Sequence, residues 1–463
     1  MTPFLLPAEP IASLEQYLAT EVGGRGLERA QRLGPDATID ELSASGLRGR
    51  GGAGFPTGRK WAGIAAQDSG RRYVVANAAE GEPGTFKDRA LLRANPYQFV
   101  EGLVIAAEAI GAEAAYIAIK ASFERETANV RRAVQEFQEA GLCGDLTVTI
   151  VGGPGEYLFG EEKAMLEVIE GNPPLPRRFP PYEHGLFATA PQQGWESTGA
   201  GPRGDLGGGE AANPTLVNNV ETLSNVPHVL AGGTDWFRSM GTESSPGTIV
   251  TTVVGDVVAP DVGEVELGTS LRDVIDAVGS GLAPGRTVQA VLSGVANAVI
   301  PGSLLDTPVT YEHLSAIGSG LGSAGFIVLD DTASMVDTAY RCSRFLSVES
   351  CGQCSPCKLG ASAITEALER IVTGDGEDAD LHRIAGWLER VTDGARCYLA
   401  TQEQQLVASF LRTFPEEFAA RVEGRLPPVR DDRPFPLLVD LADGVATYDE
   451  RYWRKRPDWT YED

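Results

Sequence analysis

The sequence predicts an α/β protein of three successive parts: a layered α/β domain, a small β-rich domain with one helix, and an α-helical domain. Three observations lead to this prediction. In the first half, short β-branched runs alternate with helical stretches. From about residue 247, short β runs with Gly and Pro turns replace that alternation. In the last part, apolar residues recur at helical spacing around four cysteines.

Strand and helix alternate through the first part. Strands are predicted at 72–76 (RYVVA), 115–119 (AYIAI) and 146–151 (LTVTIV), and helices at 96–110, 123–140 and 161–170. In the second helix, Val130, Ala133, Val134 and Phe137 share one face. Domains built this way bind ligands at the loops beyond the ends of their strands.

The middle and last parts have different patterns. The middle part has β runs at 248–255 and 257–267, a short helix over 270–278 and further strands to Leu329. Three helices follow, marked by Ile364, Leu368 and Ile371, by Leu381, Ile384, Leu388 and Val391, and by Val407, Phe410, Leu411 and Phe414. The Pro-rich, charged residues after Gly424 predict an extended tail, which either docks to a partner or has no binding role.

Four of the six cysteines form one constellation in the helical part. Cys351, Cys354 and Cys357 lie in ESCGQCSPCKLG, and 39 residues separate Cys357 from Cys397. This spacing favours one [4Fe-4S] cluster held by four thiolates, with Gly352 and Gly360 giving the backbone room and Cys397 arriving at the end of the second helix. Structural zinc favours two separated pairs, so a zinc site and unligated cysteines are the alternatives.

Composition excludes several classes of function. A net charge of −25 argues against nucleic acid as a partner. Cys143 and Cys342 stand alone, which argues against a secreted disulfide framework and for a cytoplasmic protein. Three glutamates interrupt the most apolar long stretch, residues 99–119, and the N-terminus lacks a basic region before its apolar run. We therefore expect neither a membrane span nor a signal peptide, and membrane contact only through partner subunits.

A glycine-rich run over residues 46–61 is the second chemical signal. Gly49, Gly51 and Gly54 match G-x-G-x-x-G, but no strand precedes them, so the dinucleotide-binding context fails. Glycines still let backbone amides approach a planar ring or a phosphate closely. Arg50, Arg59 and Lys60 supply positive charge there in an otherwise acidic chain. The alternative is a plain flexible loop.

Two further loops have the same character. Residues 77–89 follow the first predicted strand, and residues 152–162 follow the third and open a helix. A helix N-terminus favours an anion, yet Glu161 and Glu162 lie there. These carboxylates either cap the helix dipole or bind ribose hydroxyls and repel an additional 2′-phosphate.

Several long motifs in fixed order resemble the flavin-carrying F subunit of respiratory complex I (NADH:quinone oxidoreductase). They also resemble the related diaphorase subunits of NAD-linked hydrogenases and formate dehydrogenases. The motifs are SGLRGRGGAGFPTGRKW, NAAEGEPGTFKDR, GEYLFGEE with IEGNPPLPR, NPTLVNNVETL, and ESCGQCSPCKLG with Cys397. Together they cover most of residues 45–415.

The resemblance implies a domain order and a function. An N-terminal segment (1–44) would precede an FMN- and NADH-binding α/β domain (45–240), a β-grasp domain of the SLBB type (245–330), a helical [4Fe-4S] domain (331–425) and an extended tail (426–463). Such a protein is an NADH dehydrogenase: hydride passes from NADH to FMN, and single electrons then pass to the cluster. The implied partners are a thioredoxin-like [2Fe-2S] subunit and a larger iron-sulfur subunit, at the cytoplasmic face of a membrane complex or in the cytoplasm.

The resemblance also implies site residues. FMN would be lined by Gly49, Arg50, Gly51, Gly52, Lys60, Asn77, Glu161, Asn218, Asn219 and Thr222. NADH would contact Phe55, Lys60, Glu82, Tyr157 and Glu162, with Lys60 and Glu82 as the catalytic residues; Lys60 would stabilise negative charge on the flavin ring. Cys351, Cys354, Cys357 and Cys397 would bind the cluster.

The chain departs from the family pattern near the flavin and the nicotinamide. Ala79 replaces an acidic residue, Gly63 an aromatic one, and Phe159 and Lys163 flank the Gly-Glu-Glu motif where the family has Cys and Thr. Tyr182 keeps an aromatic ring, and a Gly-rich insertion covers about 187–212. The alternative function is therefore a divergent, non-catalytic relay or scaffold that binds flavin or NADH weakly. For the main function, we expect FMN to co-purify partially and Ala79→Asp to tighten its binding.

Overall fold

The computed structural model describes residues 3–68, 70–189, 211–429 and 432–462. The chain divides into two compact units. Unit 1 comprises residues 1–80, 88–155 and 159–248, and unit 2 comprises 81–87, 156–158 and 249–463. Most of the predicted insertion, residues 190–210, lies outside the described residues.

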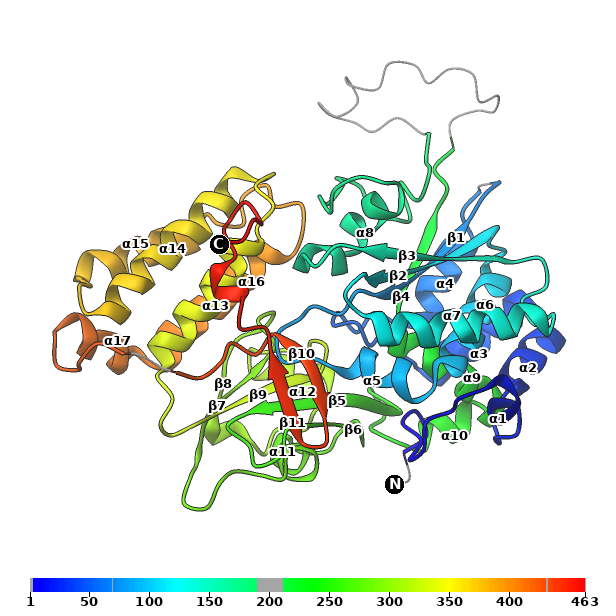
Figure 1. Ribbon diagram of the computed structural model, residues 1–463, viewed down its shortest axis with the longest axis horizontal. Helices are drawn as coiled ribbons and strands as arrows, with labels where there is room; N and C mark the ends of the chain where they lie inside the picture. Colours follow the sequence, from blue (N-terminus) through cyan, green and yellow to red (C-terminus); the bar gives the residue numbers. More distant parts are fainter. Residues whose placement is uncertain (1–2, 69, 190–210, 430–431, 463) are drawn as a thin grey trace. The chain divides into compact units, whose positions relative to one another are not determined.

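Unit 1 is an α/β domain (Figure 1). Its elements are α1 (Leu14–Leu18), α2 (Arg25–Leu33), α3 (Pro35–Ser45), α4 (Thr57–Ala65), β1 (Tyr73–Ala78), α5 (Lys87–Ala94), α6 (Pro96–Ile110), β2 (Ala114–Lys120), α7 (Glu124–Glu139), β3 (Thr147–Gly153), α8 (Glu162–Ile169), β4 (Thr215–Asn219), α9 (Val220–Gly232) and α10 (Thr234–Arg238). The three predicted strands and three predicted helices of this part are therefore present, each with ends shifted by at most two residues.

The sheet of unit 1 has the order β3-β2-β1-β4, and all its neighbouring strands are parallel. Helix α8 lies on one face, and α4, α6 and α7 lie on the other (Figure 1). On the α8 face, Tyr73, Val75 and Val217 pack with Met165 and Leu166 in one buried apolar cluster. Strand order reverses between β1 and β4, and in open α/β sheets ligands bind beyond the carboxyl ends of the strands at such a point.

The N-terminal residues are part of unit 1, although the sequence predicts a separate segment over 1–44. Helices α2 and α3 pack against α6 and α9. The fully buried carboxylate of Glu101 on α6 accepts hydrogen bonds from the Tyr17 hydroxyl (2.6 Å) and from the backbone N–H groups of Gly24 and Leu27 (both 2.8 Å). These bonds satisfy backbone N–H groups at the start of α2 that have no partner within the helix. They also attach the N-terminal helices to the domain.

Unit 2 begins with a mixed five-stranded sheet and continues into helices. Its elements are β5 (Thr248–Gly255), β6 (Asp261–Glu266), α11 (Leu271–Gly279), β7 (Val288–Ser293), β8 (Ile300–Pro301), α12 (Tyr311–Ala316), β9 (Gly325–Asp330), α13 (Met335–Glu349), α14 (Ser355–Thr373), α15 (Asp378–Leu388), α16 (Leu399–Thr413), α17 (Pro415–Val422), β10 (Leu438–Ala442) and β11 (Val445–Tyr448). The sheet order is β6-β5-β9-β7-β8. One apolar core joins this sheet to α11 and α12.

Two details of the helical part differ from the sequence prediction. Helix α15 ends at Leu388, so Cys397 lies in the following loop, two residues before α16, rather than at a helix end. A Cβ atom on Gly360 would approach Trp387 and Val391 to 3.1 Å, so this glycine lets α14 pack closely on α15. Gly352, with φ of +80°, does provide the predicted tight turn between the cysteines.

The C-terminal residues are not simply extended. Strands β10 and β11 form an antiparallel hairpin. Its turn residues Asp443 and Gly444 have φ values of +52° and +73°. An Asp-Gly pair between alternating apolar residues favours such a hairpin, because both central residues of the turn must adopt positive φ.

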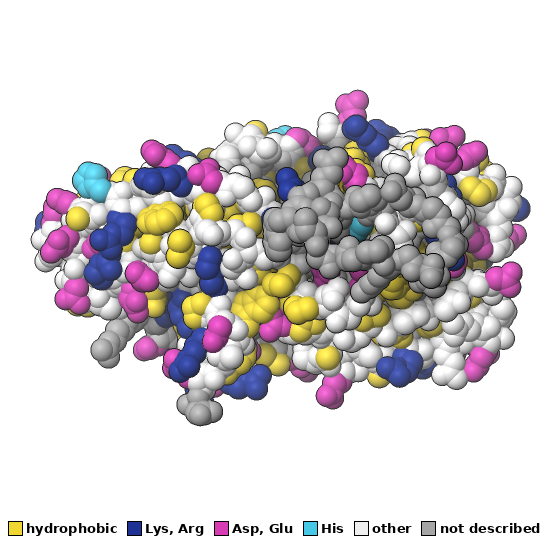
Figure 2. Space-filling model, turned by 90° about the horizontal axis from the view of Figure 1, so that it is seen from above, with side chains coloured by type: hydrophobic (Ala, Val, Ile, Leu, Met, Phe, Trp, Pro, Cys, Tyr) yellow, Lys and Arg dark blue, Asp and Glu magenta, His cyan; other side chains and the backbone are white. Residues whose placement is uncertain are grey.

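The surface of the molecule mixes charges of both signs. On the face presented in Figure 2, Asp and Glu side chains are interspersed with Lys and Arg. Within the described ranges, no helix combines the length and the apolar character needed to cross a bilayer.

Candidate functional site

Three predicted site residues lie at the carboxyl edge of the unit 1 sheet, where strand order reverses. Asn77 on β1 pairs in register with Asn219 on β4, and Asn218 is the preceding residue of β4. The Asn77 amide donates to the Gly160 carbonyl (2.7 Å), and the Asn218 side-chain oxygen accepts from the buried Trp61 indole (2.8 Å). Asn219 caps α9 and donates to Asp88 (2.6 Å). The asparagines therefore fix the loops that surround this edge.

The glycine-rich run forms a closed loop next to that edge. The Gly49 N–H donates to the Phe55 carbonyl (2.8 Å), and the Thr57 N–H donates to the Leu47 carbonyl (2.9 Å), so the two ends of the loop meet. Gly52 and Gly54 have positive φ, which only glycine adopts readily. A Cβ atom on Gly51 would lie 3.1 Å from that of Asn219. Because Gly51 has no side chain, the loop backbone can pack closely against β4.

Arg50 is placed differently from the expectation that it offers positive charge to a ligand. Its side chain is fully buried, with Nε 4.0 Å from the buried carboxylate of Glu221 on α9. Its backbone N–H donates to the hydroxyl of Thr222 (2.8 Å), which is also fully buried. Both side chains therefore fasten the glycine loop to α9. The aromatic ring of Phe55 is about half exposed, with the Arg59 guanidinium 5.7 Å from its centroid.

Lys60 and the acidic residues before α8 come together in unit 1. Lys60 Nζ lies 3.2 Å from Glu162 Oε2, and both side chains are partly exposed. Glu161 caps α8 by accepting from the N–H groups of Lys163 and Ala164 (both 3.0 Å). Burial raises the pKa of Glu161 to about 7, although Lys163 and these N–H groups oppose the shift. Lys60 is consequently a cation held in place by a carboxylate.

The location of Ala79 changes one expectation. Its side chain is buried in the apolar cluster with Phe159 and Met165. An aspartate in this position would bury a carboxylate among apolar side chains, which is costly without a partner. Ala79→Asp is therefore expected to destabilise unit 1 rather than to tighten FMN binding.

Glu82 and Tyr157 meet within unit 2. Glu82 accepts from the Tyr157 hydroxyl (2.5 Å) and from the Val295 N–H (2.6 Å). The Tyr157 oxygen in turn accepts from the Gln402 amide (2.7 Å). Burial raises the pKa of Glu82 to about 6, despite the opposing effect of these hydrogen bonds. The sequence indicates nothing about Gln402, whose contact spans 245 positions of the chain.

The four predicted cluster ligands lie where two segments of unit 2 meet. Cys351 follows the end of α13, Cys354 caps α14, and Cys357 lies in its first turn. Arg396, the neighbour of Cys397, donates to the side chain of Gln353 between the first two cysteines (2.9 Å). The Ser350 hydroxyl lies 3.4 Å from Cys357 Sγ. The segment that bears the fourth cysteine is thus bonded directly to the loop that bears the first three.

The donor set fits an iron-sulfur cluster in its chemistry. All four cysteines are free thiols, and the backbone around them turns tightly at Gly352. Among the described residues, no three His, Cys, Asp or Glu side chains already stand at the positions needed to hold one ion. Burial raises the pKa of Cys357 to about 11, and a bound metal centre would favour the thiolate that burial alone disfavours.

A buried acid behind this loop gives a test of stability. Glu403 on α16 is fully buried and accepts from the Ser343 hydroxyl (2.6 Å) through one oxygen, while its other oxygen has no hydrogen-bond partner among the described residues. Burial raises its pKa to about 8. Between its ordinary pKa and pH 8, the folded protein holds a proton that the unfolded chain releases. Stability therefore falls as pH rises through this window.

Glu403→Gln should remove this dependence, because the amide is neutral at every pH. We expect the free energy of unfolding of the variant to exceed that of the parent by on the order of a few kcal/mol at pH 8 and by almost nothing at pH 5. Urea unfolding of both proteins at the two pH values measures the effect. The exposed Glu366→Gln on α14 is the control. The same difference in free energy of unfolding at both pH values would contradict the raised pKa of Glu403.

The fold and these sites define an oxidoreductase chain with a flavin-type α/β domain and an iron-sulfur domain, and comparisons with known proteins identify its family. Residues 42–228 match the family described as the Nuo51 FMN-binding domain. Residues 337–421 match the NADH-ubiquinone oxidoreductase-F iron-sulfur binding region, a 4Fe-4S family.

Similar whole proteins agree with these matches. The F 2 subunit of NADH-quinone oxidoreductase from Rhizobium meliloti is 38% identical, covering 88% of this chain and 94% of its own. NADP-reducing hydrogenase subunit HndC of Solidesulfovibrio fructosivorans is 34% identical, covering 94% and 84%. A chain of an NAD⁺-reducing [NiFe]-hydrogenase in the air-oxidized state superposes with a TM-score of 0.74 at 30% identity, covering 92% of this chain and 69% of that one. The chain belongs to the family of NADH-quinone oxidoreductase F subunits; it is an oxidoreductase whose cofactors are FMN and a [4Fe-4S] cluster.

Proposed function

We propose that this chain oxidises NADH at the carboxyl edge of the unit 1 sheet and passes the electrons, through its cluster, to partner subunits. The observation that carries the proposal is the convergence of the glycine loop, the Asn77, Asn218 and Asn219 side chains, and the Lys60–Glu162 pair at this edge. FMN held by these residues would supply the chemistry that links a two-electron hydride donor to a one-electron iron-sulfur cluster.

The residues of unit 1 have distinct proposed roles. Gly51 and Gly52 offer backbone amides to FMN, and Gly49, whose N–H closes the loop on Phe55, lines the site through its backbone. Asn77, Asn218, Asn219 and Glu161 line it through polar side chains, whereas Arg50 and Thr222 position the loop from behind. Lys60, held by Glu162, supplies a fixed cation for the negative charge that develops on the ring.

NADH contacts are proposed for five residues that the family motifs assign: Phe55, Lys60, Glu82, Tyr157 and Glu162. The exposed Phe55 ring is available for stacking. The Glu82 carboxylate is already oriented by Tyr157 and Val295, so it can accept from a ligand without losing its position.

The domain assignments are part of the proposal. Residues 45–240 would bind FMN and NADH, and residues 331–425 would hold the cluster through Cys351, Cys354, Cys357 and Cys397. The mixed sheet packed against α11 and α12 supports assigning residues 245–330 as an SLBB β-grasp domain. A thioredoxin-like [2Fe-2S] subunit and a larger iron-sulfur subunit would receive the electrons, and any membrane attachment, at the cytoplasmic face, would be through such partners.

The test of the proposal is NADH-dependent reduction of ferricyanide by the full chain reconstituted with FMN, iron and sulfide. We expect NADH to be preferred over NADPH, because the proposed nucleotide contacts include the carboxylates Glu162 and Glu82, and a carboxylate near the adenosine ribose would repel a 2′-phosphate by roughly 1–3 kcal/mol. The Lys60 pairing partly neutralises Glu162, so the lower part of this range is expected. Glu162→Gln should narrow the ratio of the two kcat/KM values.

The matched control is Glu113→Gln. Glu113 is an exposed carboxylate paired with Arg71 (3.4 Å), and it precedes β2 at the opposite edge of the same sheet. This change should leave the ratio of the two nucleotides unaltered. Equal kcat/KM for NADH and NADPH in the parent protein would refute the role of the carboxylates, and failure of the reconstituted chain to oxidise NADH would favour a non-catalytic relay.

A further inference from the structure

The C-terminal residues pack along the helix that leads into the cysteine loop. Phe435 and Tyr452 are both buried and stack on each other (centroids 5.9 Å apart), and each also contacts the buried Phe345 of α13, at 5.4 and 5.5 Å. The Arg344 guanidinium, also on α13, lies 4.7 Å from the Trp453 ring centroid and donates to the Trp453 carbonyl (2.7 Å). This is the packing of a core element rather than of a loose tail.

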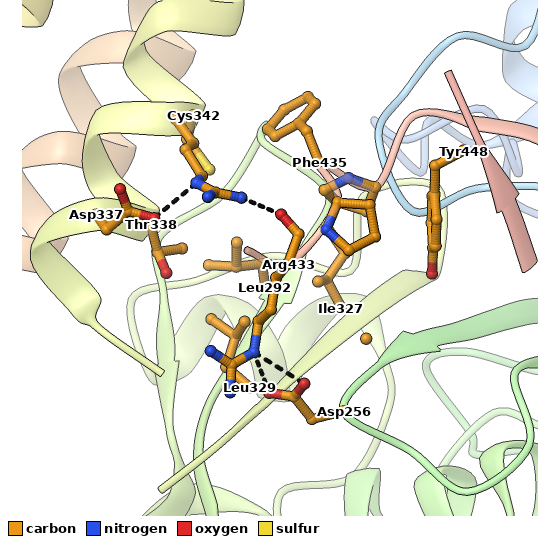
Figure 3. Close-up of a pocket in the computed structure, with 14 residues that line it drawn as sticks. Asp256, Leu292, Ile327, Leu329, Asp337, Thr338, Cys342, Arg433, Phe435 and Tyr448 are labelled. Carbon is orange, nitrogen blue, oxygen red and sulfur yellow. Dashed lines mark hydrogen bonds and ion pairs between the residues drawn. The ribbon is translucent and has the colours of Figure 1, made fainter. Parts of the chain in front are cut away.

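Residues next to Phe435 in the sequence bond to other parts of unit 2 (Figure 3). Arg433 forms an ion pair with Asp256 (2.9 Å) at the end of β5 and another with Asp330 (3.1 Å) at the end of β9. The Gly84 N–H donates to the Pro436 carbonyl (2.7 Å). A cavity of about 140 Å³ lies at this junction, with Phe435, Cys342 and Tyr448 among its lining residues. Residues 433–453 are thus attached to the sheet near their first residue and to α13 near their last.

A buried ion pair lies where α13 ends. Lys455 Nζ is 2.7 Å from Glu349 Oε1, and the two side chains are 5% and 2% exposed. The Tyr452 hydroxyl donates to the same oxygen (3.2 Å). Glu349 is the last residue of α13 and stands two positions before Cys351. Its other oxygen accepts from the backbone N–H of Tyr157 (3.0 Å), whose hydroxyl contacts Glu82.

Two more bonds connect the C-terminal residues to the flanks of the cysteine loop. The Trp459 indole donates to the Val348 carbonyl (2.9 Å). Lys358, which follows Cys357, donates to the Ser350 carbonyl (2.6 Å) and to the Pro457 carbonyl (2.7 Å). The chain on both sides of the three cysteines is therefore bonded to residues near the C-terminus, about a hundred positions away.

We propose that residues 432–462 brace the cysteine loop, and that Lys455 is a positioning residue that sets, through Glu349, both the start of this loop and the backbone of Tyr157. The inference rests on the proposed function only in taking Cys351, Cys354 and Cys357 as cluster ligands. A buried charge pair at a helix end fixes geometry strongly, because removing one partner leaves the other charge buried and uncompensated. Among the described residues, the Lys455 ammonium pairs with Glu349 rather than with a cysteine, so it acts on the cysteine loop indirectly.

The test compares Lys455→Met with Arg451→Met, a control in the same segment whose side chain is 80% exposed and, within the described part of the chain, pairs with Asp449. In the cluster-free full-length protein, hydrogen exchange of peptides covering residues 349–358 should be about tenfold faster in Lys455→Met and unchanged in the control. After reconstitution, loss of the cluster to a chelator should accelerate by a similar factor, and the EPR spectrum of the reduced cluster should shift, while FMN content stays constant.

Further variants and outcomes keep the two proposals separate. If Lys455→Met does not fold, the double variant Lys455→Met with Glu349→Gln removes both buried charges, and the same exchange measurement is made on it. Exchange of residues 349–358 equal to that of the parent, in either folded variant, overturns the brace. A parent protein that takes up no iron instead overturns the cluster assignment, and the exchange result still decides whether the brace exists.

Discussion

Cys397→Ser is expected to leave the protein without a normal [4Fe-4S] cluster. The first three cysteines lie within one turn and the first residues of α14, whereas Cys397 comes from the loop before α16, so no neighbouring thiol of the motif can replace it. Iron and sulfide should fall from about four of each per chain to well below that value. The EPR signal of the reduced cubane should disappear with them.

Cys143→Ser is the matched control. Cys143 is also a free thiol, buried where Cys397 is partly exposed, but it belongs to unit 1, whereas the four predicted ligands all belong to unit 2. Its replacement should leave iron, sulfide and the EPR spectrum at the level of the parent protein. A parent preparation that contains only zinc, or a Cys397→Ser variant with unchanged iron content, would reject the four-cysteine assignment.

Gly51→Val is expected to weaken FMN binding by about 10- to 100-fold, the equivalent of roughly 1–3 kcal/mol of steric overlap. The β-carbon alone would stand 3.1 Å from that of Asn219, and the two methyl groups would fill the space between the loop and β4. Gly51 does not require positive φ, so the substitution acts through volume rather than through backbone strain. Titration of the flavin-free protein, followed by flavin fluorescence, gives the dissociation constant.

Gly70→Val controls for the change of glycine to valine. Gly70 precedes β1 at the amino edge of the same sheet, and a Cβ atom there meets no other atom within 4 Å. It is exposed and does not require positive φ. FMN affinity should therefore match that of the parent. Equal loss in both variants would show that the glycine loop does not form the flavin site.

Local sequence signals predict the elements whose ends are chemically marked. The helix over 96–110 is predicted with its observed ends, because Asn95 caps it, Pro96 occupies its first turn and Gly111 ends it in the left-handed conformation. Helix α13 is absent from the sequence prediction. Several of its buried residues are polar, among them Asp337, Ser343 and Glu349, so its buried face does not follow an apolar helical period in the sequence. The Asp443–Gly444 hairpin is absent as well, even though its turn signal is strong.

The chemistry of the site residues is predictable from motifs, whereas their partners are not. The Lys60–Glu162 and Asn219–Asp88 contacts join residues that all lie in the family motifs, but no local pattern indicates that they meet. The Gln402–Tyr157 and Lys455–Glu349 contacts join positions with no shared motif at all. Burial also reassigns residue roles: Arg50 faces α9, and Ala79 lies in an apolar core, which composition alone does not reveal.

The interleaving of the two units limits how the protein can be divided. Residues 81–87 and 156–158 leave unit 1 in sequence but belong to unit 2, where Glu82 bonds to Val295 and Tyr157 bonds to Gln402. A protease cut or a gene split near Thr248 would therefore produce an N-terminal fragment with two orphaned loops and a C-terminal fragment without two of its own segments. Splitting this protein into independently folding modules therefore requires rebuilding those loops. Insertion or truncation at the N-terminal side of unit 2 is expected to destabilise the fold.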